Sequence, residues 1–184
     1  MKLLKIFGLL AFLTLGTLTT QAQVDATINP INAIWGKYSL GADITLSQNL
    51  SIEPTISILS KETGDGKYTG IPANLFLKYY FNPSNGADRF YVDVWARYVN
   101  RKFDYDPENI EVYSNFDQNR FGVGFGIGYK VVSQKGFVFD IGFGTGRAII
   151  DDTNYTNSDL QRENIDWPEI MFAGKLGIGY RFGG

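Results

Sequence analysis

Charged side chains recur at alternate positions of several β-like segments, where they share a phase with small or polar residues. The set holds four acids and five bases: Asp43, Glu53, Lys78, Asp93, Arg97, Lys130, Asp140, Lys175 and Arg181. Alternate residues of a strand point to the same face of a sheet. If the strands close around an interior, these charges would pair there, because an unpaired buried charge is costly. The chemistry predicted is ion pairing in a lumen.

The composition removes the side chains that most enzymes need. The 184 residues include no His and no Cys, so the commonest general base, thiolate nucleophiles and cysteine metal clusters are absent. We therefore expect a protein that is not an enzyme, with no catalytic, cofactor-binding or metal-binding residues and no cofactor. A formal net charge of −2 gives no basic field for nucleic acid.

The N-terminus has the pattern of a secretory signal peptide. Lys2 and Lys5 precede an apolar run over residues 6–18, which is shorter than the roughly 20 residues of a transmembrane helix. Small residues Thr20 and Ala22 then occupy the −3 and −1 places of a cleavage site. We predict a signal peptide over 1–22 and a single exported domain over 23–184.

The rest of the chain shows period-two alternation and no helical periodicity. Phe121, Val123 and Phe125 alternate with Gly122 and Gly124, for example. The alternation predicts eight strands, at 27–35, 38–47, 50–60, 70–82, 89–103, 119–132, 137–150 and 169–183. Connections over 48–49, 83–88 and 133–136 are short, whereas those over 61–69, 104–118 and 151–168 are long. An even strand count with short turns at one end and long loops at the other is typical of outer-membrane barrels.

The orientation of the two strand faces decides between two kinds of barrel. A soluble, lipocalin-like barrel would turn its apolar face inward around a small hydrophobic ligand, and this alternative stays open. It would leave the many strand glycines on the surface. We expect the reverse orientation, with Phe125, Ile127, Ile141 and Ile178 outside against lipid. The glycines would then make room in a narrow lumen for four large side chains, namely Phe76, Tyr80, Tyr91 and Trp95.

The closing segment, Lys175 to Phe182, alternates apolar residues and carries Tyr180 and Phe182 near its end. With the strand pattern over about 27–183, it resembles the small OmpA-like and OmpX-like outer-membrane barrels of Gram-negative bacteria. The resemblance implies an eight-stranded antiparallel up-and-down transmembrane β-barrel, with Tyr180 and Phe182 as a signal to the barrel-assembly machinery. It also implies contact with outer-membrane lipid and lipopolysaccharide, a monomeric state and a structural or surface-interaction role.

Two of the long connections are strongly acidic. One contains Asp104, Asp106, Glu108, Glu111 and Asp117; the other contains Asp151, Asp152, Asp159, Glu163 and Asp166 against a single Arg162. Oxygen-rich loops can bind Ca²⁺, but the glycine-punctuated spacing of a calcium loop is missing. Solvated loops are the favoured interpretation, and calcium binding is left open.

Overall fold

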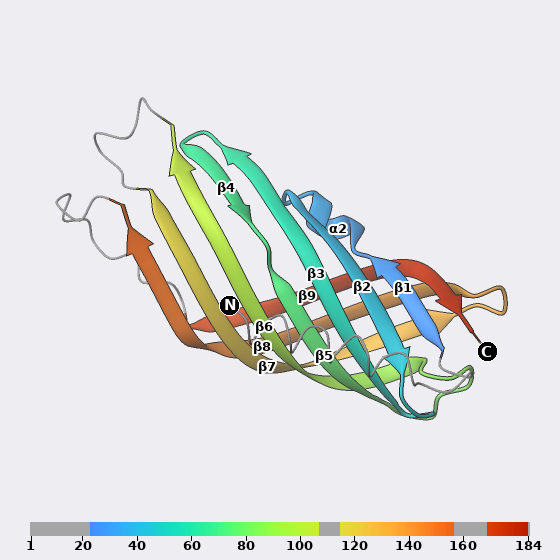
Figure 1. Cartoon of the computed structure of the whole chain (residues 1–184). Coiled ribbons are helices and arrows are strands. Elements are labelled where there is room, and N and C mark those ends of the chain that lie inside the picture. Colours follow the sequence, from blue (N-terminus) through green and yellow to red (C-terminus); the bar gives the residue numbers. More distant parts are fainter. Residues whose placement is uncertain (1–22, 107–114, 157–168, 184) are drawn as a thin grey trace, which may run out of the picture.

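The protein is a single antiparallel sheet whose strands close into a ring (Figure 1). The computed structural model describes residues 23–106, 115–156 and 169–183. Its strands are β1 (Val24–Ile28), β2 (Lys37–Thr45), β3 (Leu50–Thr63), β4 (Gly66–Gly70), β5 (Ala73–Tyr80), β6 (Arg89–Tyr105), β7 (Phe116–Val132), β8 (Phe137–Tyr155) and β9 (Ile170–Phe182). β1 pairs with both β2 and β9, which closes the ring. The predicted all-β antiparallel architecture is confirmed.

The described residues contain nine strands, one more than predicted. Both β4 and β5 lie between β3 and β6, because each pairs with those two strands. Nine strands therefore occupy eight positions around the ring. The break falls at Ile71 and Pro72, where proline has no N–H to donate to the ladder. The predicted connection over 61–69 is wrong for most of its length, since residues 61–63 extend β3 and Gly66–Gly70 forms β4.

The N-terminal segment also differs from the predicted strand over 27–35. β1 starts earlier, at Val24, and ends at Ile28, and a short helix α2 (Pro30–Ala33) follows it. Pro30 explains the change, because a proline ring suits the first turn of a helix and interrupts strand pairing. The expectation of no helix after residue 23 is thus wrong for these four residues. α2 lies at one rim of the ring (Figure 1).

The strands are strongly staggered around the ring. From Ile44, the partner residues lead through Val24 of β1 to Phe182 on β9. In the other direction they lead through Ile52, Leu77, Val94, Phe125 and Thr145 to Phe172, ten residues before Phe182. A closed sheet requires a stagger of this kind, which tilts the strands relative to the ring axis.

The two faces of the sheet have the predicted orientation. Phe125, Ile127, Ile141 and Ile178 lie outside, with exposed fractions of 66%, 55%, 51% and 46%. In contrast, most charged residues of the opposite phase are buried inside the ring, and Arg97 and Lys175 are half-buried there. This distribution is inverted relative to a water-soluble globular domain, in which large apolar side chains form the core.

Glycines on β7 and β8 leave room inside the ring for aromatic side chains of β6. A Cβ added at Gly128 would collide with the Tyr91 ring, and one added at Gly124 would collide with Trp95. Tyr91 cannot easily move away, because its hydroxyl donates a hydrogen bond to Asp140 Oδ1 at 2.8 Å. Tyr91 and Trp95 are buried, as are Phe76 and Tyr80. The predicted packing of small against large residues is confirmed.

We expect Gly128→Ala to lower the free energy of unfolding by about 1–3 kcal/mol, because overpacking forces Tyr91 off its hydrogen-bonded position. Urea denaturation of the purified protein measures the change. Gly174→Ala is the matched control on β9, because a Cβ there would meet nothing within 4 Å. Equal effects of the two substitutions would contradict the packing argument.

Candidate functional site: the interior ion-pair network

The interior of the ring holds a continuous network of buried ion pairs. Its acids and bases come from seven strands: Asp25 (β1), Asp43 (β2), Glu53 (β3), Lys78 (β5), Lys130 (β7), Asp140 (β8), and Lys175 and Arg181 (β9). Strand alternation aims these side chains inward, and the stagger of the strands brings them to a common region. Four acids face four bases, so the network is neutral in total.

Lys78 is the centre of the network. Its Nζ lies 2.9 Å from Asp43 Oδ2, 2.5 Å from Glu53 Oε2 and 2.9 Å from Asp140 Oδ2. These three buried carboxylates are close enough to one another to resemble a metal site. The Lys78 ammonium already lies among them, however, and supplies the positive charge that a metal ion would bring. Their arrangement therefore fits ion pairing and not metal binding.

A second arm of the network runs toward the short-turn end of the ring. Lys130 Nζ lies 2.7 Å from Asp25 Oδ2 and 2.9 Å from Asp43 Oδ2. Arg181 binds the same Asp25 in a bidentate manner, through Nε at 2.6 Å and Nη2 at 2.8 Å. The guanidinium also donates to the backbone carbonyls of Asn85 and Ala87, which belong to the turn between β5 and β6. Arg181 thus ties β9 to this turn.

Lys175 completes the network on the side of the long connections. Its Nζ contacts Glu53 Oε1 and Asp140 Oδ2, at 2.6 Å and 2.5 Å. Two tyrosines add hydrogen bonds to these carboxylates. Tyr80 Oη donates to Asp43 Oδ2 at 3.0 Å, the oxygen that Lys78 and Lys130 also contact, and Tyr91 Oη donates to the second oxygen of Asp140, Oδ1. The rings of these tyrosines also face the Lys130 and Lys78 ammonium groups, at 4.9 Å and 4.8 Å from the ring centroids.

Of the nine charged residues predicted to form the lumen network, the structure brings seven together and leaves two apart. Asp93 is buried, but no described cation forms an ion pair with it. Arg97 points into the interior and binds neutral groups: its Nε donates to Asn74 Oδ1 and its Nη1 to the carbonyl oxygen of Phe172. These two predicted members therefore take no part in the described ion pairs. The charges of Lys78 and Lys175 act on Asp93 without contacting it, and Arg97 binds neutral oxygens.

Asp25 was missed by the sequence prediction. The predicted first strand began at residue 27, so Asp25 was left outside the sheet. Its position two residues before Thr27 would have given it the inward phase, and this spacing was the available signal. The tyrosine side chains were predicted to fill space, but their hydrogen bonds to carboxylates were not predicted.

The predicted assembly signal lies at the end of β9. Tyr180 and Phe182 both point outward, with exposed fractions of 44% and 56%, and their ring centroids are 5.2 Å apart. The acidic connections lie largely outside the described residues, at 107–114 and 157–168. Asp104, Asp117, Asp151 and Asp152, predicted to lie in those connections, instead belong to extended strands.

The chain matches, over residues 7–179, a family described as proteins of unknown function, DUF3575. Because this match covers nearly the whole sequence, the protein belongs to that family. No curated protein is significantly similar to it. In the part of the chain that the structure describes, no helix is long and apolar enough to cross a membrane.

We expect Lys78→Met to lower the free energy of unfolding by about 3–5 kcal/mol, because it leaves buried carboxylates without their central cation. Chemical denaturation of the purified protein measures this loss. Lys67→Met is the control, since Lys67 pairs with Glu62 at 3.7 Å on the surface. An exposed pair contributes about 1 kcal/mol or less. A Lys78 variant as stable as the control would show that the network does not support the fold.

Proposed function

We propose that this protein is an outer-membrane β-barrel with a structural or surface-interaction role and a lumen plugged by paired charges. In this proposal, residues 1–22 are a cleaved signal peptide and the barrel contacts lipid and lipopolysaccharide as a monomer. Tyr180 and Phe182 are presented to the barrel-assembly machinery. The observation that carries the proposal is the inverted sheet, which has large apolar side chains outside and buried ions inside.

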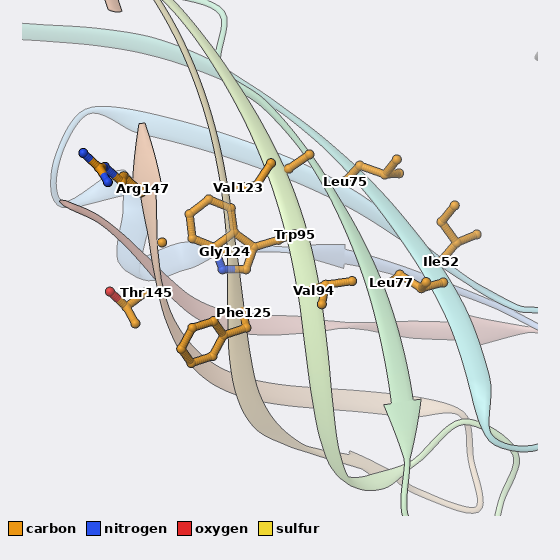
Figure 2. A pocket seen from close by; sticks show the side chains of 12 residues that line it. Ile52, Leu75, Leu77, Val94, Trp95, Val123, Gly124, Phe125, Thr145 and Arg147 are labelled. Atoms are coloured by element: carbon orange, nitrogen blue, oxygen red, sulfur yellow. The ribbon is translucent and has the colours of Figure 1, made fainter. Parts of the chain in front are cut away.

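The outer face has the chemistry of a lipid-contacting surface. Large apolar side chains are more than half exposed on neighbouring strands, among them Val94, Phe125, Phe143 and Phe172. Figure 2 draws part of this face, where Ile52, Leu75, Leu77, Val94, Val123 and Phe125 line a common apolar hollow. Soluble monomers rarely expose apolar patches larger than a few hundred Å². A bilayer around the ring would cover this surface.

The interior supports a plugged lumen and argues against an open pore. Tyr80, Ala87 and Tyr91 form a buried cluster at the short-turn end, and Arg181 is hydrogen-bonded to the adjoining turn. The ion network fills the space next to this cluster. A ring of eight strand positions leaves an interior just wide enough for side chains. The buried charges likewise argue against the alternative of a lipocalin-like carrier, which needs an apolar interior.

The lengths of three strands support a role at the cell surface. β6, β7 and β8 have 17, 17 and 19 residues, whereas a tilted membrane-spanning strand needs about 9–11. In Figure 1 these strands and β4 extend well past α2 at the rim where the long connections begin. The excess length would carry the sheet beyond the bilayer on that side and present it to external partners.

Cell fractionation tests the location directly. The full-length protein expressed in a Gram-negative host should sediment with the outer membrane. Its gel mobility should change on boiling, because a hydrogen-bonded closed sheet resists unheated detergent. Recovery only from the soluble periplasm, without heat-modifiable mobility, would contradict the proposal and favour a soluble carrier.

Phe125→Arg distinguishes lipid from water as the solvent of the outer face. In a bilayer an outward arginine at mid-depth destabilises the protein by about 2–4 kcal/mol, which should reduce assembly into membranes. For a soluble protein the same change would be neutral or would improve solubility. Gly64→Arg, in the turn after β3 where a Cβ meets nothing within 4 Å, is the control and should assemble normally.

A further inference from the structure

A polar cavity inside the ring lies between the ion network and the rim formed by α2. Its volume is about 40 Å³. Its charged lining consists of Lys37, Arg97, Lys175 and Glu53. Glu53 is already bound by Lys78 and Lys175. Since the neighbouring ion network is neutral in total, Lys37 and Arg97 give the cavity lining two uncompensated positive charges.

Neither of these cations has an acidic partner among the described residues. Arg97 uses Nε and Nη1 for neutral oxygens, of Asn74 at 2.6 Å and Phe172 at 2.7 Å, so its Nη2 has no bound acceptor in this part of the chain. The Lys37 ammonium forms no hydrogen bond or ion pair with any described residue, although the Lys37 backbone pairs with Leu59 of β3. Two partly buried like charges beside one cavity are unfavourable unless an anion compensates them.

The neutral groups of the cavity are held in place by one another. Asn74 Nδ2 donates to Thr55 Oγ1 at 2.7 Å, and Asn32 Nδ2 donates to Ser39 Oγ at 3.0 Å. Asn74 therefore fixes the Arg97 guanidinium by accepting its Nε–H, so the arginine is oriented before any ligand arrives. Asn29 is the exception among these groups, because its buried side-chain oxygen lines the cavity without a hydrogen-bond partner. As an acceptor, this oxygen would bond only to a protonated oxygen of a bound anion.

We propose that this cavity binds a compact oxyanion, such as a phosphate or carboxylate group, between Lys37 and Arg97. The volume is on the order of a few water molecules, which suits a compact group better than a sugar ring or an acyl chain. Arginine matches the planar, multidentate oxygen pattern of these anions, and lysine adds a point charge. The site lies inside the ring, so it does not depend on whether lipid or water surrounds the protein.

Calorimetric titration of the folded, detergent-solubilised protein with inorganic phosphate tests the proposal. Sodium chloride keeps the ionic strength constant. Saturable binding is expected, and Lys37→Gln and Arg97→Gln should each weaken it about tenfold or more, since each removes a charge-assisted hydrogen bond. Lys102→Gln is the control. This exposed cation of β6 pairs with Asp117 at 3.3 Å, and its loss should leave the affinity unchanged.

Two results would overturn the proposal. One is no saturable heat up to about 10 mM phosphate, which is weaker than any specific site of this kind should be. The other is equal weakening by all three substitutions, which would indicate a general charge effect. Arg97→Gln also breaks the contact with Asn74, and could impair folding for that reason. Lys37→Gln breaks no described contact and keeps the test decisive. Failure of phosphate binding would leave the membrane fractionation result unaffected.

Discussion

The arrangement of this protein depends on the cost of removing charge from water. Inside a narrow ring each carboxylate and ammonium group loses most of its hydration, and only close opposite charges with further hydrogen bonds can replace it. The chain meets this requirement by drawing on almost every strand. A continuous path of contacts runs from Arg181 through Asp25, Lys130, Asp43 and Lys78 to the carboxylates that also bind Lys175. Removing one member would leave its neighbours as buried charges without a partner, at the same cost in free energy.

This requirement explains the two chemical faces of the sheet. With ions and tyrosines inside, the apolar side chains of the opposite phase must lie outside, because a strand alternates its faces. The glycines of β7 and β8 are needed for the same arrangement. They free the space that Tyr91 and Trp95 occupy, and Tyr91 then supplies a hydrogen bond to Asp140. In the interior, the packing around Tyr91 therefore also determines the hydrogen bonding of a buried carboxylate.

The interior differs between its two ends. Toward the short turns, aromatic packing and the hydrogen bonds of Arg181 block the interior of the ring. Behind them, ion pairs of balanced charge fill the interior. Toward the rim of α2, the lining is polar and carries the excess charge of Lys37 and Arg97. For a family without an assigned function, this asymmetry directs attention to the end from which β6, β7 and β8 project. There, both a polar cavity and extended strands would be open to the exterior.

The sequence by itself determined the all-β class, the orientation of the two faces and the identity of most interior ions. These follow from period-two alternation, which is a local property readable from residues such as Phe121 to Phe125. The strand boundaries predicted from this alternation were wrong where a proline interrupts the local pattern, as at Pro30 and Pro72. The alternation also could not establish which charges meet. Asp93 and Arg97 have the same inward phase as Lys78, yet only Lys78 reaches three carboxylates. That choice depends on the ten-residue stagger between strands, which sets the depth of each side chain in the ring and exists only once the sheet has closed.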